Sequence, residues 1–305
     1  MCFEFVSQQS GKSIFTGVVS FCEATLFYWG FMRRKRFWAC VLVFILGITA
    51  TPLFGACNGT NLPLINSGKL NLDGYELVFE DDFDGNALNL NLWEHRGTTA
   101  KLDGFYRPEQ AGVENGNLVI KAEYTEGKYG EGWYSGNIHT KEEFVYGYYE
   151  IRCICNAEND FWSAFWLTQE GVYDHDISKG GVAGAEIDVF ESYRDKSGRD
   201  KNYIISSIHC NGSDDDRENI ESKRVAKVRV ENLTTQYNTF GLMWTENEYI
   251  FYVNGVETGR TSFGLGVSRV PEHVVVSLCI PDKITLPKEK TTSFLVDYVK
   301  IYQIK

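Results

Sequence analysis

The sequence predicts an all-β fold, a sandwich of two antiparallel sheets, and three observations support it. Short segments rich in Val, Ile, Tyr and Phe recur from residue 75 to residue 303, and many of them alternate polar and apolar side chains. Turn signals separate these segments, including Asn-Gly at 115–116 and 254–255, a pair that favours tight hairpins. No stretch keeps a helical period. Many strands without helices are typical of a β-sandwich.

Twelve strands follow from this pattern, each a run of β-prone residues between turn signals. With 43% hydrophobic and 14% aromatic residues, the chain can fill the core of one large domain. The strand Tyr249–Val253 begins a hairpin that turns at the second Asn-Gly pair. In chain order, the expected strands are Tyr75–Glu80, Asn117–Glu123, Gly136–Thr140, Tyr146–Cys155, Ser163–Thr168, Glu186–Ser192, Tyr203–Cys210, Lys223–Glu231, Tyr237–Trp244, Tyr249–Val253, Val274–Cys279 and Ser293–Gln303.

Two connecting segments attract attention because of their composition. Gln169–Ala183 is rich in Gly and Asp and leads directly into Glu186, so we expect it to be a functional loop. Asn211–Asn219 contains three consecutive aspartates at 214–216. Because this segment lacks the EF-hand pattern, we expect a solvated loop and no calcium site there.

The first 57 residues have the layout of an upstream extension followed by an export signal. A basic run at 33–36 precedes an apolar stretch, Phe37–Ile48, and small residues before Cys57. Met32 stands before the basic run, so residues 1–31 are expected to come from a misplaced start codon; the alternative is a cytoplasmic tail before an uncleaved anchor. Leu53–Cys57 resembles a bacterial lipobox with Cys57 as the lipidated residue, and the alternative is an ordinary cleavage site.

We therefore expect residues 58–69 to be a linker and residues 70–305 to be the functional domain of a periplasmic, cell-surface or secreted protein. Residues 58–305 hold 25 basic and 39 acidic side chains, a net charge of −14. Such a domain repels nucleic acid phosphates and suits a neutral substrate.

The cysteines of the domain predict no metal site. They lack the paired spacing of zinc ligands, so we expect buried thiols. A bridge from Cys153 or Cys155 to Cys210 or Cys279 is the alternative.

The segment GAEIDVFES at 184–192 places three carboxylates in an otherwise apolar, β-prone run. On a regular strand Glu186 and Asp188 share a face and Glu191 points away. One extra residue, a β-bulge between Asp188 and Glu191, would return Glu191 to that face. The outer Cα atoms would then be about 13 Å apart, so two inward-leaning Glu side chains can reach the roughly 5–5.5 Å separation of a retaining glycosidase. Side-by-side carboxylates also raise one another's pKa, which suits a site that needs both an acid and a base.

Ordered matches over about residues 76–303 make the chain resemble glycoside hydrolase family 16, the laminarinase, lichenase and agarase-like endoglycanases. Residues 186–191 match the bulged form of its signature, Glu-Ile-Asp-x-x-Glu. The other matching segments are LVFEDDFDG at 77–85 followed by Trp93, YSG at 134–136, YGYYEIR at 146–152, FWSAFWL at 161–167, TFGLMW at 239–244 and VDYVKIY at 296–302. Ser163 replaces a common Pro.

This resemblance implies a β-jelly roll whose concave face binds a glycan, and it implies a role for each carboxylate. Glu186 would be the nucleophile that forms a glycosyl-enzyme. Glu191 would be the general acid and then the base that activates water. Asp188 would hydrogen-bond Glu186 and tune the titration of the set. The expected outcome is retention of anomeric configuration.

Aromatic and polar residues around the signature are candidates for sugar binding. Trp162 and Trp166 alternate with Phe161 and Phe165, so one pair faces the core and the other faces outward. A Trp ring suits the apolar face of a pyranose. His209 could hydrogen-bond the sugar or the nucleophile.

Three further residues are candidates for the rim of the binding site, namely Tyr134, Arg107 and Glu143. Relatives in the family bind a structural Ca²⁺ on the convex face, and Asp297 with a carbonyl near Gly116 stands at matching positions. We expect catalysis itself to need no cofactor.

The sequence thus predicts a monomeric, retaining endo-β-glycosidase that hydrolyses an extracellular β-1,3-(1,4-)glucan, touching a membrane only through a lipid at Cys57. The loop Gln169–Ala183 and the segment HCNG at 209–212 depart from common laminarinases, so an endo-β-galactosidase acting on galactan or mucin-type O-glycans is the alternative. A transglycosylase and a non-catalytic glycan-binding protein are the rivals from other classes.

Overall fold

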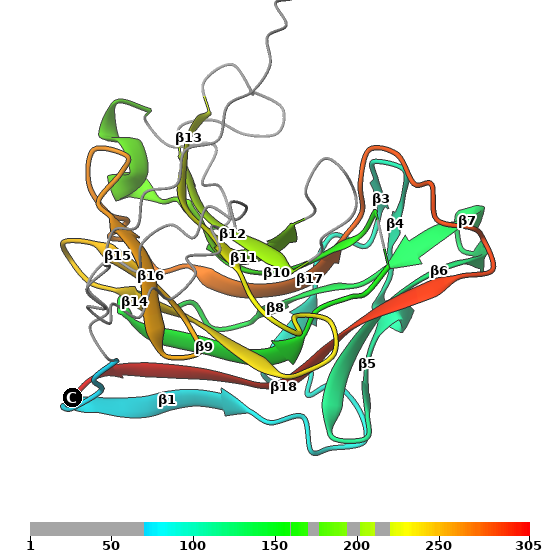
Figure 1. Ribbon diagram of the computed structural model, residues 1–305, viewed down its shortest axis with the longest axis horizontal. Helices are drawn as coiled ribbons and strands as arrows, with labels where there is room; N and C mark the ends of the chain where they lie inside the picture. Colours follow the sequence, from blue (N-terminus) through cyan, green and yellow to red (C-terminus); the bar gives the residue numbers. More distant parts are fainter. Residues whose placement is uncertain (1–69, 159, 170–176, 194–201, 211–219) are drawn as a thin grey trace, which may run out of the picture. The chain divides into compact units, whose positions relative to one another are not determined.

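The computed structural model describes residues 70–158, 160–169, 177–193, 202–210 and 220–305. They form two β-sheets packed face to face, as the sequence predicts (Figure 1). The expected export signal, linker and acidic triplet lie outside these residues, as do residues 170–176 of the loop Gln169–Ala183. Within them, no helix is long and apolar enough to cross a membrane.

The seven-stranded sheet carries the carboxylate signature. Every neighbouring pair in it is antiparallel. Its order is β13 (Glu221–Arg229), β12 (Tyr203–Cys210), β11 (Glu186–Tyr193), β10 (Trp162–Thr168), β17 (His273–Cys279), β8 (Asn137–Thr140) and β2 (Trp93–His95).

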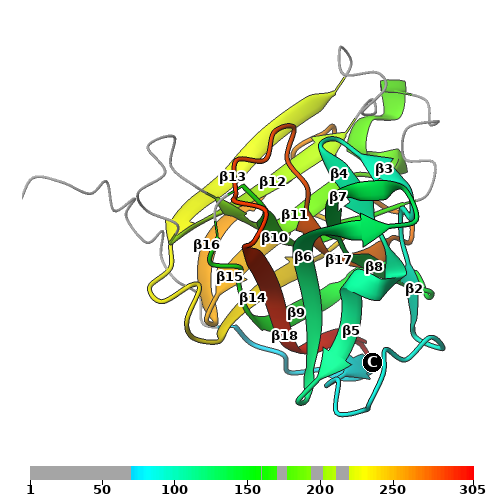
Figure 2. The ribbon, with the colours of Figure 1, turned by 90° about the vertical axis from the view of Figure 1, so that its right-hand side faces the viewer.

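The second sheet has eleven strands. Figure 2 shows three of them, β18, β6 and β5, running side by side. Its order is β16 (Val256–Thr261), β15 (Tyr249–Val253), β14 (Asn238–Trp244), β9 (Gly147–Ile154), β18 (Thr291–Ile304), β6 (Asn117–Gly127), β7 (Gly130–Ser135), β4 (Gly104–Tyr106) and β3 (Ala100–Lys101), with β1 (Tyr75–Asp81) on β18 and β5 (Ala111–Glu114) on β6. Only the β4–β7 pair is parallel within this described sheet. Two 3₁₀ segments, η1 (Pro108–Gln110) and η2 (Ile177–Ala183), complete the described elements.

All twelve expected strands are present, and the largest error is the end of β6, four residues beyond the expected Glu123. The strands that the sequence did not predict are β2, β3, β4, β5, β7 and β16. Most of these have two to four residues, too few to show an alternating pattern. β7, with the sequence GEGWYS, contains two glycines, which weaken a strand signal.

The core lies between the sheets and is built by alternation along each strand. Phe165 and Leu167 of β10 are buried in it, as are Ile151 and Cys153 of β9. Because alternate side chains of a strand point to opposite faces, the intervening residues of β10, β11 and β17 lie on the other face of the seven-stranded sheet. We call this the outer face, and it carries the polar residues described below.

The four described cysteines are free thiols, as the sequence predicts, and no bridge joins them. Three are buried, and Cys279 is partly exposed on the outer face. Burial raises the pKa of Cys279 to about 12, with further contributions from the nearby charges of Glu191 and Asp188 and with opposing hydrogen bonds, so it stays a neutral thiol.

Candidate active site

The bulge that the sequence predicts is present in β11. Asp188 lies opposite Ser207 of β12, and Glu191 lies opposite Ile205, so three steps along β11 match only two along β12. The register toward β10 shifts at the same place. One extra residue therefore separates the second and third acids of the signature.

The extra residue changes which side chains face the core. Val189 and Phe190, although adjacent, are both buried in the core. Glu191 therefore returns to the outer face with Glu186 and Asp188, as the bulge requires. The Val189 carbonyl accepts a hydrogen bond of 2.8 Å from the Ser206 hydroxyl, which ties the bulge to β12.

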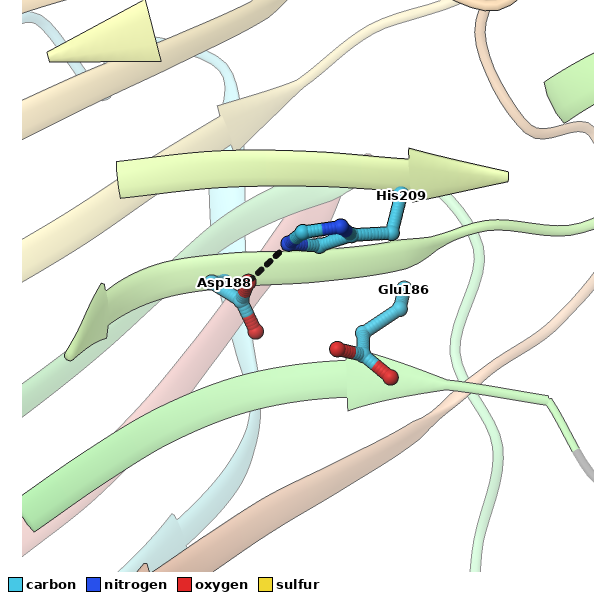
Figure 3. A group of neighbouring side chains, drawn as sticks. All are labelled: Glu186, Asp188 and His209. Carbon is cyan, nitrogen blue, oxygen red and sulfur yellow. Dashed lines mark ion pairs between the residues drawn. The ribbon is translucent and has the colours of Figure 1, made fainter. Parts of the chain in front are cut away.

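The side chains of Glu186, Asp188 and His209 converge on the outer face (Figure 3). His209 lies directly opposite Glu186 in the β11–β12 pair. Its Nε2 is 3.1 Å from an Oδ2 of Asp188. One polar atom from each of Glu186, Asp188 and His209 lies within 4.8 Å of the others. The sequence suggested a hydrogen bond from His209 to the sugar or to the nucleophile, and the structure shows its partner among the carboxylates to be Asp188.

Trp162 orients the third acid. Its indole Nε1–H donates a hydrogen bond of 2.8 Å to Oε1 of Glu191. Both side chains are partly buried on the outer face. Because this hydrogen bond stabilises the ionised carboxylate, it lowers the pKa of Glu191 and opposes the raising effect of burial.

Burial and neighbouring charges raise the pKa values of Asp188 and Glu191. Burial and then the charge of Glu186 raise the pKa of Asp188 to about 6, against an opposing hydrogen bond from His209. Burial and then the charge of Asp188 raise the pKa of Glu191 to about 7, against the opposing Trp162 hydrogen bond. Near neutral pH, Glu191 can therefore give up or accept a proton, which is what an acid and base catalyst must do.

His209 behaves as a cation in this cluster. Burial lowers its pKa, but the hydrogen bond to Asp188 and the charges of the three carboxylates raise it to about 9. Its Nδ1 lies 2.6 Å from Oγ of Ser222 in β13, so both ring nitrogens have partners. The cluster also has the donor types of a metal site, where a metal ion would have to displace the His209 proton. In the structure these groups form a hydrogen-bonded acid cluster.

The Trp166 ring contacts the guanidinium of Arg96 beside this cluster. It lies opposite Asp188 in the β10–β11 pair, and its Nε1–H donates a hydrogen bond of 3.0 Å to Ser277 Oγ of β17. The Arg96 guanidinium lies 5.1 Å from the Trp166 ring centroid. This is the geometry of a cation–π contact. As predicted, the two pairs lie on opposite faces, and the structure shows that Phe161 and Phe165 face the core and Trp162 and Trp166 face outward.

Glu143 lies near the Glu186 end of the outer face. Its Oε1 is 3.6 Å from Nε2 of His273, the first residue of β17. His273 lies opposite Thr168 of β10. Leu167 pairs with Ile187 in the β10–β11 pair, so the next residue of β10, Thr168, lies beside Glu186. The position agrees with a residue at the rim of the site.

Tyr134 and Arg107 are placed differently from the prediction. Tyr134 is 2% exposed, and its hydroxyl donates a hydrogen bond of 2.7 Å to the Gly130 carbonyl within β7. Its polar group is therefore used inside the hairpin and is not presented to a sugar. Arg107 pairs with Glu109 at 3.1 Å and lies 5.8 Å from the Tyr129 ring centroid. Both residues belong to the β4–β7 region of the other sheet, and the structure does not join them to the carboxylates.

Sequence reasoning missed Ser222, Ser277 and Arg96. Serines on strands carry no signal of their own, and each acts here only because a neighbouring strand brings a histidine or tryptophan within reach. Arg96 follows β2, a strand that the sequence did not predict. A search for cations near the ends of the Trp-containing segments could have found it.

The expected calcium site on the other sheet does not fit the residues present. Val296 pairs with Leu118, two residues beyond Gly116, so Asp297 is close to the predicted carbonyl. However, Asp297 accepts a hydrogen bond from the guanidinium of Arg152, whose carbon lies 4.3 Å from the Tyr237 ring centroid. A cation fixed on this carboxylate competes with Ca²⁺, which needs six to eight oxygen ligands.

We predict that the fold is indifferent to calcium. Excess EDTA or added CaCl₂ should move the melting temperature of the full chain by less than about 1 °C, because an ion that does not bind the folded state cannot stabilise it. Arg152→Gln should lower the melting temperature by about 2–4 °C, through loss of roughly 1 kcal/mol of ion-pair and ring contact. Differential scanning calorimetry measures both. A rise of several degrees in wild-type protein on adding calcium would contradict the prediction.

A family model described as the glycoside hydrolase family 16 domain of β-porphyranases A–D matches residues 77–304. The chain is 27% identical over 175 residues to the endo-1,3-1,4-β-glycanase ExsH of Rhizobium meliloti, which covers 56% of this chain and 33% of that protein. It is 26% identical over 308 residues to a keratan-sulfate endo-1,4-β-galactosidase of Sphingobacterium multivorum, covering 90% of this chain and 68% of that protein. The chain thus spans about a third of the length of the first relative.

Solved structures agree on the fold. SCLam, a non-specific endo-β-1,3(4)-glucanase, superimposes with a TM-score of 0.63 at 20% identity and covers 78% of this chain and 95% of its own. A structure from a study of mucin O-glycanases of human gut bacteria gives a TM-score of 0.62 at 19% identity, covering 78% and 94%. At these identities the likeness establishes the jelly-roll architecture alone.

Proposed function

The chain belongs to glycoside hydrolase family 16, and on that premise we propose that it is a retaining endo-β-glycosidase acting on a galactose-containing polysaccharide. The observation that carries the chemistry is the bulge in β11, which brings Glu191 to the face of Glu186 and Asp188. A sugar-binding protein without catalysis has no need of three clustered acids, whose mutual repulsion and burial are unfavourable.

The proposed reaction has two steps. An oxygen of the Glu186 carboxylate attacks the anomeric carbon, the glycosidic bond breaks, and Glu191 gives its proton to the departing oxygen. Glu191, now ionised, then removes a proton from water, and that water displaces Glu186 from the anomeric carbon. Two inversions give net retention. Asp188, held by His209, lies between the two glutamates in sequence, and its charge raises the pKa of Glu191.

Because the matching family model is that of β-porphyranases, we propose a galactan as the substrate in place of the β-glucan expected from the sequence. Porphyran and keratan sulfate both contain galactose and carry sulfate groups, and both names occur among the matches. The glucan remains the alternative, because one matched relative is a 1,3-1,4-β-glycanase. The Arg96 guanidinium, stacked on Trp166 beside Asp188, supports a substrate with an anionic substituent, although the domain as a whole is acidic.

A panel of polysaccharides tests the proposal. We expect the full chain to shorten porphyran, agarose, keratan sulfate or mucin O-glycans to defined oligosaccharides, and to leave laminarin and lichenan largely intact. Product size by chromatography and anomeric configuration by NMR are the measurements. Products longer than the substrate would identify a transglycosylase. Cleavage of laminarin in preference to every galactan would contradict the substrate assignment, and no cleavage of any member would contradict the function.

We also propose that the protein works outside the cytoplasm as a monomer. The basic, apolar and small-residue succession ending at Cys57 supports export, with lipidation of Cys57 as the means of anchoring. A polysaccharide too large to cross a membrane has to be cleaved outside the cytoplasm. Radiolabelled palmitate incorporation and its loss in Cys57→Ala test the anchor.

A further inference from the structure

A buried carboxyl group lies behind the proposed nucleophile. Glu272, just before β17, is 0% exposed. Its Oε1 accepts a hydrogen bond of 3.2 Å from the backbone N–H of Ala185. Ala185 is the residue immediately before Glu186, where β11 begins. The carboxyl group of Glu272 therefore contacts the backbone from which the nucleophile projects.

The anchor for this contact is itself held firmly. The backbone N–H and carbonyl of Glu272 form a pair of 2.9 Å hydrogen bonds with the carbonyl and N–H of Phe144. The phenyl ring of Phe144 is buried in the core. The side chain of Glu272 thus links the start of β17 and the segment at 144 to the start of β11, three segments far apart in sequence.

A buried acid is an expensive way to make this link. Among the described residues no donor lies within normal hydrogen-bonding geometry of Glu272 Oε2, although the Ser268 hydroxyl is close enough to affect its pKa. A hydrophobic side chain of similar volume would avoid that cost. The acceptor oxygen is what a hydrophobic residue could not supply, because the Ala185 N–H would then be buried without a partner.

The surroundings keep the group neutral. Burial raises the pKa of Glu272 to about 8; the Ser268 hydroxyl and the Ala185 N–H oppose this, and the charges of Glu143 and Glu186 add to it. The other titratable groups facing it are the phenols of Tyr149 in β9 and Tyr249 in β15, whose own pKa values are raised well above the usual range by burial and then by Glu272. Below about pH 8 the Glu272 carboxyl group itself therefore adds no negative charge behind Glu186.

We infer that Glu272 is a positioning residue of the proposed glycosidase. Its neutral carboxyl group holds the Ala185 N–H, and through it the start of β11, so that Glu186 is aimed at the anomeric carbon and Glu272 adds no negative charge behind it. The inference rests on the proposed function and adds a residue outside the carboxylate signature.

Two substitutions separate the acceptor from the charge. Glu272→Leu removes the acceptor, and we expect kcat to fall by about 10- to 100-fold with KM within a factor of about two, because the nucleophile is misaligned but sugar contacts are kept. Glu272→Gln keeps an acceptor oxygen and no charge, and we expect wild-type kcat at pH 6–7. The substrate is a dinitrophenyl β-glycoside of the disaccharide that the enzyme releases from the polysaccharide it cleaves fastest. The dinitrophenolate leaving group needs no proton from Glu191.

The pH profile gives a second readout. In wild-type protein kcat/KM on this substrate should fall above about pH 8, where Glu272 ionises and repels the Glu186 carboxylate. Glu272→Gln cannot ionise, so its rate should exceed that of wild type several-fold at pH 9. If Glu272→Leu fails to fold, this comparison still decides the question: equal decline in both proteins would overturn the inference.

Controls distinguish positioning from general stability. Active enzyme is counted by trapping with a dinitrophenyl 2-deoxy-2-fluoro glycoside, so that unfolded protein does not lower the measured kcat. Glu257, a buried glutamate of β16 paired with Arg260 at 2.6 Å in the other sheet, is the matched site. Glu257→Leu should lower the melting temperature and leave kcat per trapped site unchanged.

The outcomes are separable from those of the proposed function. A Glu272→Leu protein with wild-type kcat per trapped site, or a Glu272→Gln protein as slow as Glu272→Leu, would overturn the positioning role and leave the glycosidase proposal intact. A wild-type chain that is inert on every glycan would overturn both.

Discussion

Replacement of Glu186 by Gln should lower kcat by about 10⁴-fold or more on every substrate that the wild type cleaves, because an amide oxygen cannot form the glycosyl-enzyme ester. Binding should survive, since the amide keeps the size and most of the polarity of the carboxylate. Stopped assays of reducing-sugar release measure the rate, and isothermal titration calorimetry measures binding of an oligosaccharide product.

The fold of Glu186→Gln should be intact, and its melting temperature should be equal to that of wild type or higher. The charge of Glu186 raises the pKa of Asp188, so removing it relieves repulsion within the cluster. Glu80→Gln is the matched control, because Glu80 pairs with Lys300 on the other sheet at 2.7 Å. Near-normal turnover by Glu186→Gln, with Glu80→Gln also normal, would refute the assigned role of Glu186.

Replacement of Glu191 by Ala should lower kcat by about 10²- to 10⁴-fold on polysaccharide, where a proton must reach the departing oxygen. On a dinitrophenyl glycoside the loss in the first step should be small, because that leaving group departs without a proton. Azide should then restore turnover by attacking the glycosyl-enzyme without help from a base, and NMR should show a glycosyl azide with the anomeric configuration of the substrate.

The pH profile provides an independent check on Glu191. An acid with a pKa of about 7 is protonated below that pH, so wild-type kcat/KM on polysaccharide should decline as pH rises above about 7. In Glu191→Ala the residual kcat/KM on polysaccharide should no longer decline near pH 7. Absence of azide rescue together with an unchanged profile would assign the acid role to another residue.

Much of the candidate site could be predicted because its members are neighbours in the chain. Glu186, Asp188 and Glu191 fall within six residues, and the spacing itself required a bulge for all three to share a face. Strand alternation likewise placed Trp162 and Trp166 on the face opposite to Phe161 and Phe165, and the structure decided which pair faces outward.

The errors and omissions have a common physical origin. Tyr134 was assigned to the rim by its position in a matching segment, but the β6–β7 hairpin uses its hydroxyl internally. The calcium expectation rested on Asp297 and Gly116, and it could not account for Arg152, which comes from another strand. In both cases the partner that decided the role was invisible from the local sequence.

The sequence by itself determined the strands, the faces of their side chains and the chemistry of the carboxylate signature, because these depend on alternation and on residues a few positions apart. Only the tertiary structure decided the raised pKa values of Asp188 and Glu191 and the hydrogen bond between His209 and Ser222. The same holds for the cation–π contact of Arg96 with Trp166 and the hydrogen bond from Ala185 to Glu272. Each of these joins residues that are distant along the chain, and each depends on how deeply folding removes the groups from water.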